Sequence, residues 1–200
     1  MGGDQAFVAK LERMLALPPH FEIGRYPTTI HEMTEMAAVP FGQYAHSNEP
    51  VHHVLHLFTA AGRPDLAQHW VRRVLNELYT PESFCGDEDN GAMGSWYVLN
   101  ALGLYALTPG HPAWVLGAPL FPRAVVQLGQ GSTLEIRTVN FAPEAHYVAE
   151  VHLNGRLVES LEVAHAALAA GGELVFTMTT DAERARARGQ LARPFSLSSP

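Results

Sequence analysis

The sequence contains a single cysteine, Cys85, and few basic residues, and one cysteine excludes an internal disulfide framework. There are 13 lysines and arginines against 20 acidic residues, a formal charge of -7, which argues against a surface for nucleic acid or anionic membranes. No run of about 18 apolar residues is present, so the sequence predicts no membrane span. The first residues carry acids within their apolar part and lack a small-residue cleavage site, which is not typical of a secretory signal.

Hydrophobic residues make up 47% of the 200 residues, which is enough for a substantial core and too many for a disordered chain. Residues 4–107 show the apolar spacing of helices. Pro50 and Pro64 stand where a first helical turn tolerates proline, and the short Gly62–Pro64 corner predicts that the two helices form an antiparallel hairpin. Residues 91–106 are apolar nearly all round and predict a buried helix.

After Pro109 the apolar period changes to two, which predicts strands. The Asn154-Gly155 turn predicts an antiparallel hairpin of 148–153 with 156–161. The other expected strands are 124–128, 133–139 and 173–178. Residues 181–200 carry four arginines and no apolar periodicity, so we expect a disordered tail. The predicted class is α+β, with helices in 1–120, an antiparallel β region in 121–180 and the tail in 181–200.

Polar side chains gather first in residues 42–53. Asn48 can be an N-cap while nearby histidines hydrogen-bond within the fold, which is the purely structural interpretation. Asn48 and Glu49 also offer hard oxygen ligands of the kind that calcium prefers. Alternatively, His52 and His56 lie four residues apart on one helix face and could bind zinc together with Glu49.

The second polar segment is the acidic run 85–91, just before the apolar segment 91–106. Three consecutive acids repel one another, which costs stability unless a cation, sugar hydroxyls or the positive end of a helix dipole compensates. The spacing lacks the alternation and the distant glutamate of an EF-hand loop. Asp87 and Asp89, if held in a pocket, could take a proton from water as general bases.

Both segments resemble motifs of glycoside hydrolase family 92, which contains exo-acting α-mannosidases, many of them specific for α-1,2 links. Residues 42–53 are similar to the family's G-x-Y-x-H-G-N-E-P-S-H-H segment. Residues 86–98 are similar to its G-[ND]-[DE]-D-x-G-x-M-S-[AS]-W-Y-V run, with 78–80 and 117–121 in the family's order. The resemblance covers about residues 3–180.

The resemblance implies the C-terminal portion of an inverting, calcium-dependent exo-α-mannosidase acting on mannose-containing glycans. It also implies late helical hairpins of an (α/α)6 barrel, followed by antiparallel strands of a β-sandwich. Asn48 and Glu49 fall on the family's calcium (Ca2+) motif, and Asp87 and Asp89 on its general-base pair. The matched substrate-binding positions are His46, Glu49, His52 and His53.

The chain departs from the family most clearly at the general acid. In the family that acid is a glutamate in an E-G-N segment, which this sequence lacks. Glu32 and Glu35 stand in a different context, where, with His31, they only faintly resemble a zinc-protease helix. Family members are also several times longer. We therefore expect this chain alone to be inactive or nearly so, with the N-terminal part of such an enzyme as its partner.

Smaller departures are Ser47 in place of the family's glycine and Gly94 in place of its usual serine. Two other functions stay open: a zinc hydrolase using Glu49, His52 and His56, and a non-catalytic carbohydrate-binding module built on 124–178. Family members are usually periplasmic or secreted, and the compartment of this chain is left open.

Overall fold

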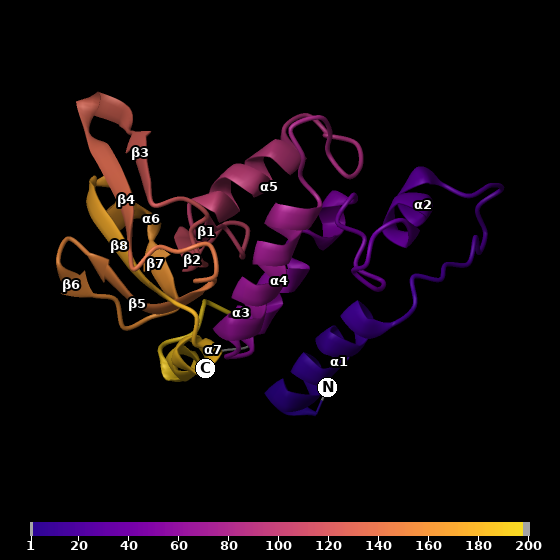
Figure 1. Cartoon of the computed structure of the whole chain (residues 1–200), viewed down its shortest axis with the longest axis horizontal. Coiled ribbons are helices and arrows are strands. Elements are labelled where there is room, and N and C mark those ends of the chain that lie inside the picture. The colour runs from indigo at the N-terminus through magenta and orange to yellow at the C-terminus, as the bar shows by residue number, and fades with distance from the viewer. Residues whose placement is uncertain (1, 198–200) are drawn as a thin grey trace.

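A computed structural model describes residues 2–197, and Figure 1 shows helices in the centre and on one side of the molecule and strands on the other. The expected mixture of helices and strands is confirmed. The helices are α1 Gly3–Ala16, α2 His31–Ala37, α3 Leu57–Ala60, α4 Pro64–Glu77, α5 Ala92–Ala101, α6 His165–Ala169 and α7 Ala182–Ala187. The 3-10 turns in this described part are η1 Glu49–Val51, η2 Val54–His56, η3 Gly129–Gly131 and η4 Arg188–Gln190.

The strands are β1 Leu104–Tyr105, β2 Ala113–Leu116, β3 Arg123–Gln127, β4 Thr133–Val139, β5 Tyr147–Leu153, β6 Arg156–Leu157, β7 Glu162–Ala164 and β8 Gly172–Thr179. They form a three-stranded sheet in the order β1-β2-β7 and a five-stranded sheet in the order β3-β4-β8-β5-β6. Buried side chains from both sheets join in a single apolar cluster. Across residues 2–197, none of the helices combines the length and apolar character that a bilayer crossing requires.

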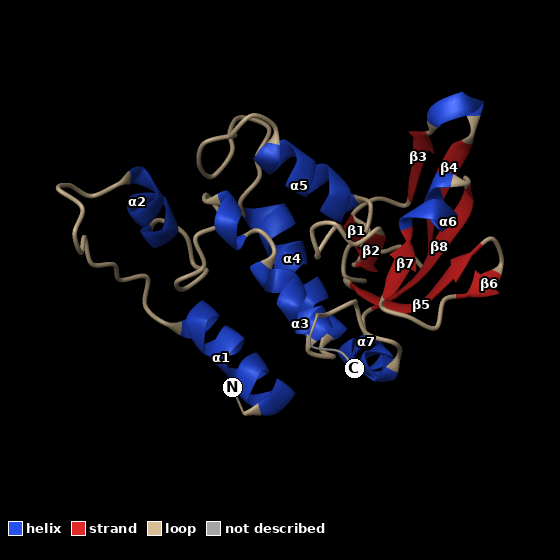
Figure 2. Cartoon of the chain, turned by 180° about the vertical axis from the view of Figure 1, so that it is seen from behind, coloured by secondary structure: helices blue, strands red, loops and turns tan. Residues whose placement is uncertain are grey.

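The helical side has an apolar core of its own. Helix α1 buries Val8, Leu11 and Leu15, which recur at three and four residues along one face. These side chains belong to one cluster with Phe41 and Phe58, and α1 lies beside α3 and α4 (Figure 2). Helices α3 and α4 pack together across the Gly62–Pro64 corner, as the sequence predicts.

The segment from Pro50 to Gly62 is not the continuous helix that its sequence predicts. In an α-helix the amide of His56 would bind the carbonyl of His52, four residues earlier. That carbonyl instead accepts a hydrogen bond from the indole of Trp96 at 3.0 Å, and the His56 amide binds the carbonyl of His53 at 3.0 Å. The chain therefore runs through η1 and η2 before α3 begins.

The apolar segment 91–106 is helical only as far as Ala101. Gly103 has a φ of 78°, a left-handed conformation that a helix cannot continue through, and β1 follows. The expected burial on all sides also fails, because Met93 and Trp96 are buried while Val98 on the other side is 55% exposed.

The five-stranded sheet is not wholly antiparallel, contrary to the prediction. Strand β8 pairs with β4 in parallel, from Leu134 opposite Gly172 to Val139 opposite Thr177. The long connection through β7 and α6 allows β8 to enter in this direction. The Asn154-Gly155 hairpin forms but is short, because the chain leaves β6 to place β7 against β2. Strand β2 ends before residue 120 and pairs with β7, which lies after it. The β region therefore begins earlier than the predicted boundary at residue 121.

Helices and sheets are joined by polar contacts from α4. The Gln68 side-chain oxygen accepts a hydrogen bond from the Val148 amide at 3.0 Å, and the buried Arg72 guanidinium donates to the Pro119 carbonyl at 2.6 Å. Both contacts satisfy backbone groups that would otherwise be buried without partners.

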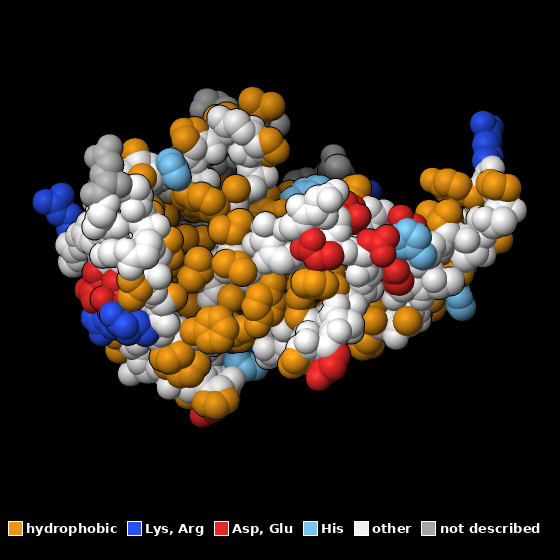
Figure 3. Space-filling model, turned by 90° about the horizontal axis from the view of Figure 1, so that it is seen from above, with side chains coloured by type: hydrophobic (Ala, Val, Ile, Leu, Met, Phe, Trp, Pro, Cys, Tyr) orange, Lys and Arg blue, Asp and Glu red, His pale blue; other side chains and the backbone are white. Residues whose placement is uncertain are grey.

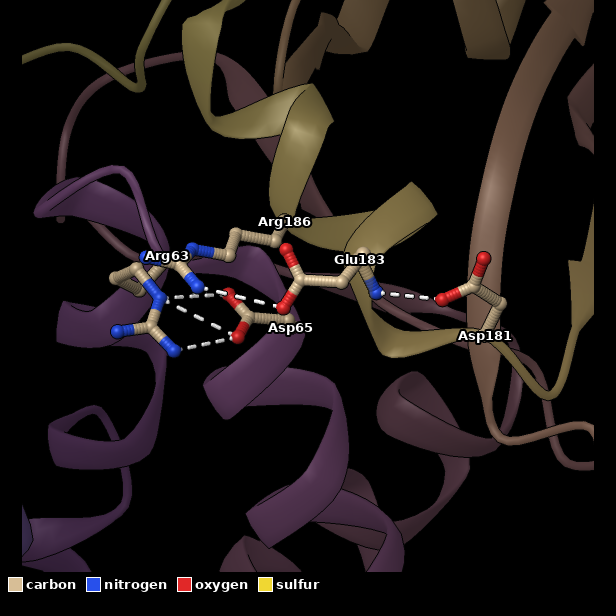
Figure 4. Close-up of polar contacts among 5 residues, drawn as sticks. All are labelled: Arg63, Asp65, Asp181, Glu183 and Arg186. Carbon is tan, nitrogen blue, oxygen red and sulfur yellow. Dashed lines mark hydrogen bonds and ion pairs between the residues drawn. The ribbon is translucent and has the colours of Figure 1, made fainter.

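The expected disordered tail is wrong for residues 181–197, which contain α7 and η4. The Asp181 side chain caps α7 by accepting the Glu183 amide at 2.9 Å, and Ala185 is fully buried. Figure 4 shows the Glu183–Arg186 pair beside the Arg63–Asp65 pair at the start of α4. Only two turns of helix are involved, which is too short for apolar periodicity to show in the sequence. Residues 198–200 lie outside the described residues.

Candidate active site

The two polar loops lie against each other. The side-chain carboxyls of Glu49 and Asp89 lie close enough to shift each other's pKa. Behind them the loops pack so closely that a Cβ on Gly86 would lie 2.5 Å from the Ser47 Cβ. Trp96 follows the acidic loop on α5 and hydrogen-bonds the first loop at His52. The structure therefore brings the two predicted segments into one site.

The contact between Glu49 and Asp89 changes the acidity of both groups. The contact with the Glu49 carboxylate is the main cause that raises the pKa of Asp89, because that carboxylate can accept a proton donated by Asp89. The pKa of Glu49 is lowered by its own backbone hydrogen bond first and by Asp89 second. The two shifts have opposite directions, which makes Asp89 the weaker acid of the pair.

Helix α2 forms a second border of the site, which the sequence did not indicate. His31 lies 3.8 Å from Asp87 and also approaches Glu32 at 3.6 Å and Glu35 at 3.3 Å. Desolvation opposes protonation of His31, but the carboxylates of Glu32, Glu35 and Asp87 together raise its pKa. The only feature of the sequence that pointed to this cluster was the four-residue spacing of His31 and Glu35, which predicts a contact between their side chains on a helix.

Figure 3 shows acidic and histidine side chains gathered on one face of the molecule, next to a broad apolar area. One apolar groove close to the acidic loop has a volume of about 370 Å3. Its main lining side chains are Tyr79, Phe84, Tyr97 and Val98.

His46 lies beneath the loops and not on their surface. It is 1% exposed, and its ring nitrogens hydrogen-bond the hydroxyls of Tyr44 at 2.9 Å and Tyr79 at 2.8 Å. Its ring also packs edge-on against Trp96, with centroids 4.3 Å apart. Burial, and then His52, lower the pKa of His46 to about 3, so the ring is neutral. This geometry corrects the prediction of direct substrate contact and makes His46 a support for the loop.

His52 and His56 face the interior too, which contradicts the zinc alternative. The His52 ring donates to the His46 carbonyl at 3.0 Å, and burial lowers its pKa. The His56 ring is 2% exposed and stacks on Tyr105 at 3.9 Å, and burial lowers its pKa to about 3. Among residues 2–197, no three His, Cys, Asp or Glu side chains come together as a metal cluster. Of the predicted histidines, only His53 is exposed.

Asn48 stands at the N-cap position of η1 but makes no side-chain capping hydrogen bond. The purely structural role for its amide is therefore not seen. Its side chain is half-buried next to the exposed Glu49, which in turn contacts Asp89. These are hard oxygen ligands, as calcium prefers, but they are fewer than the six to eight that calcium takes.

The model of the glycosyl hydrolase family 92 catalytic domain matches residues 1–180. The chain belongs to this family. A family 92 α-mannosidase from Bacteroides thetaiotaomicron has a similar structure with a TM-score of 0.82 at 28% identity. That match covers 99% of this chain and 25% of the other. The same enzyme in complex with mannoimidazole matches with a TM-score of 0.80.

Two further relatives extend the comparison. A family 92 inverting mannosidase from Bacteroides thetaiotaomicron is 34% identical with a TM-score of 0.78, covering all of this chain and 27% of the other. An uncharacterized secreted glycosidase from Arthroderma benhamiae is 30% identical over 155 residues, which are 75% of this chain and 20% of the relative. The chain thus spans about a quarter or less of the length of these relatives.

Proposed function

We propose that the chain provides the base-bearing and calcium-bearing side of the active site of an inverting exo-α-mannosidase. The observation that carries this proposal is the contact between Glu49 and Asp89, which unites the two family motifs in one site. The similarity to an inverting family 92 mannosidase supports the stereochemistry. In this proposal the helices belong to an (α/α)6 barrel that other segments complete.

Asn48 and Glu49 would hold calcium. Asp89 would lie close enough to interact with the charge of the ion. Three oxygen-bearing side chains leave room for water and sugar hydroxyls among the six to eight ligands of the ion. When bound, calcium would supply positive charge for orienting sugar hydroxyls. Calcium would also favour the charged form of both carboxyls, because a nearby cation stabilises negative charge.

Asp87 and Asp89 would activate the attacking water. Both side chains are exposed, so a water molecule can reach them. The general acid must stand roughly 6.5–9.5 Å from the base to leave room for this water. In this proposal it comes from a segment outside the 200 residues, and the chain alone does not turn over substrate.

Sugar hydroxyls would be contacted by Glu49 and His53, which are the exposed members of the predicted substrate set. His46 and His52 would act indirectly, by holding the loop that carries both. A mannose-containing glycan is therefore the expected ligand of this face.

The Asp89→Asn variant tests the assignment of the base in a full-length relative that carries both loops. Asparagine keeps the shape of the side chain but cannot accept the proton, so turnover should fall by about 100- to 10,000-fold. The measurement is kcat on an α-1,2-linked mannobiose, with circular dichroism to show that the fold persists. Turnover close to that of the parent enzyme would show that another carboxylate is the base.

The purified 200-residue chain provides a second test. Hydrolysis of α-1,2-mannobiose by this chain in the presence of calcium would contradict the role of an external acid. Calorimetric titration of mannose against the chain also addresses the carbohydrate-binding alternative. Binding that survives Asp89→Asn and Glu49→Gln, but requires the strands 124–178, would favour that alternative.

A further inference from the structure

Glu88 lies between the two proposed bases but points the other way. Asp87 and Asp89 are exposed, whereas Glu88 is half-buried against the start of α5. Its Oε2 accepts the Gly91 amide at 2.6 Å, and its Oε1 accepts the Gly94 amide at 3.0 Å. Each oxygen of this carboxylate thus binds a separate backbone amide.

The backbone around these contacts is unusual. Asp89, Asn90 and Gly91 have φ values of 53°, 54° and 98°, so three successive residues are left-handed. Side chains disfavour this conformation, and Asp89 and Asn90 both have one. The two amides that Glu88 binds lie at the end of this turn, at Gly91, and in the first turn of α5, at Gly94. The Glu88 carboxylate thus ties the left-handed turn to the start of α5 from within the same loop.

Helix α5 also depends on Glu88. Its N-cap residue is Gly91, which has no side chain with which to cap the helix. Glu88 supplies that cap from three residues before Gly91, at the end of the helix where a negative charge is stabilised. The same helix holds Trp96, which binds the first loop at His52. Glu88 therefore connects the left-handed turn to the helix that joins the two loops.

We propose that Glu88 is a positioning residue that fixes the direction of the Asp89 carboxylate toward Glu49. The proposal rests on the proposed function, because it concerns the base of that reaction. Loss of the Glu88 carboxylate removes the anion that holds three left-handed residues in place. Asp89 then relaxes toward ordinary conformations and leaves Glu49, although its own chemistry is unchanged.

The first experiment measures amide hydrogen exchange by NMR in this chain. Glu88→Ala should speed exchange at Gly91 and Gly94 by about 10-fold or more, while amides of β4 and β8 stay protected. Glu88→Gln retains one acceptor oxygen, so it should protect one of the two amides. The matched control is Glu82→Ala, at an exposed position in the same loop, which should change neither amide. Unchanged exchange in Glu88→Ala would overturn the proposal.

The second experiment measures kcat and KM in a full-length relative that has the same Gly-Asp-Glu-Asp-Asn-Gly run. The Glu88→Ala change should lower kcat by about 10- to 100-fold with KM changed less than about threefold, because a misdirected base affects the chemical step. Glu88→Gln should restore part of the loss, and Glu82→Ala should have no effect. A purely structural cap would predict faster exchange with kcat unchanged, and that result would overturn the proposal.

The Asp89→Asn variant separates this proposal from the proposed function. If Asp89→Asn leaves turnover intact, the assignment of the base is wrong. The exchange of Gly91 and Gly94 in Glu88→Ala still decides in that case whether Glu88 holds the turn. If Asp89→Asn abolishes turnover and Glu88→Ala does not reduce it, the positioning role alone is wrong.

Discussion

Single histidines in this chain have opposite roles although they lie within a few residues of each other. His46 is 1% exposed and joins Tyr44 to Tyr79, which come from different parts of the chain. His53, seven residues later, is exposed. The sequence motif contains both and does not distinguish them. Burial therefore decides which histidine supports the loop and which can meet a ligand.

Replacement of His46 by alanine should destabilise the chain by about 2–4 kcal/mol, because it creates a cavity and leaves the buried Tyr44 hydroxyl without its partner. The matched variant His53→Ala should change the free energy of unfolding by less than about 0.5 kcal/mol. Urea unfolding, followed by tryptophan fluorescence, measures both. Equal losses in the two variants would contradict the assigned burial.

Acid should destabilise the chain through His46 and His56. Burial lowers the pKa of each to about 3, below the ordinary value of 6.5 that applies after unfolding. The unfolded state therefore binds more protons as pH falls below 6.5, and the stabilisation present above that pH is lost. Two such groups should lower the free energy of unfolding by about 4 kcal/mol between pH 7.5 and pH 5.

Urea unfolding at the two pH values measures this effect. The His56→Gln variant serves as an internal check, because it removes one of the two groups and should reduce the pH dependence by about half. Stability that does not change between pH 7.5 and pH 5 would mean that the rings are accessible to protons in the folded chain.

At the scale of elements, α1 is attached to the first loop by a very close backbone contact. Gly42 has a φ of 63°, and a Cβ added there would lie 2.5 Å from the carbonyl group of Leu15, at the end of α1. The Gln43 amide also binds the carbonyl of Met14 at 3.0 Å. Only glycine permits both the left-handed backbone and this approach.

Gly42→Ala should therefore destabilise the chain by more than the roughly 1 kcal/mol expected from its left-handed backbone alone. Gly110→Ala is the matched control, because Gly110 has a φ of 80° but nothing within 4 Å of an added Cβ. The difference between the two variants in urea unfolding isolates the contact with α1. Identical losses would show that the contact is easily relaxed.

The elements that the sequence predicted well are those whose partners are near in sequence. The α3–α4 corner and the strands β3, β4, β5 and β8 follow from local period and turn residues. The helix expected after Pro50 was wrong because its carbonyl at His52 is taken by Trp96, 44 residues later. The parallel pairing of β8 with β4 was missed for the same reason, since it depends on a distant connection.

In the site, too, the sequence predicted the features that depend on nearby residues and missed those that depend on distant ones. The motifs pointed to the two loops, and the structure brings Glu49 close to Asp89 and Gly86 close to Ser47, while the roles of Asp87, Asp89 and Glu49 stay predictions. The four-residue spacing of His31 and Glu35 indicated a contact within α2, but not that α2 would bring His31 to this face. The inward direction of Glu88 was equally hidden, because it depends on a left-handed turn that ordinary residues adopt only when something holds them.

At the scale of the whole molecule, the C-terminal helix α7 closes the junction between helices and sheets. It contacts both α4 and β5, and Ala185 is the fully buried residue at this contact. Arg193 reaches further and pairs with Asp4 at 2.6 Å, which brings the two ends of the described chain together. A segment that looked disordered thus binds α1, α4 and β5.

A charge placed in this junction should be costly. We expect Ala185→Asp to destabilise the chain by about 1–3 kcal/mol, because Ala185 is fully buried and the larger side chain must displace its neighbours and lose its hydration. Ala187→Asp, at an exposed position two residues later on the same helix, should be close to neutral. Thermal unfolding of both variants provides the comparison. A neutral result for Ala185→Asp would mean that residues 181–197 do not dock in solution.

The position of β8 in the sheet has a consequence for the order in which the molecule can assemble. This strand is the last one within residues 2–197 and yet lies between β4 and β5, which do not pair with each other. Until about residue 179 has been synthesised, the ribosome therefore carries β4 and β5 with open hydrogen-bonding edges. Such edges are aggregation sites in an unfinished chain. A nascent chain halted before β8 is thus the form that most needs a chaperone.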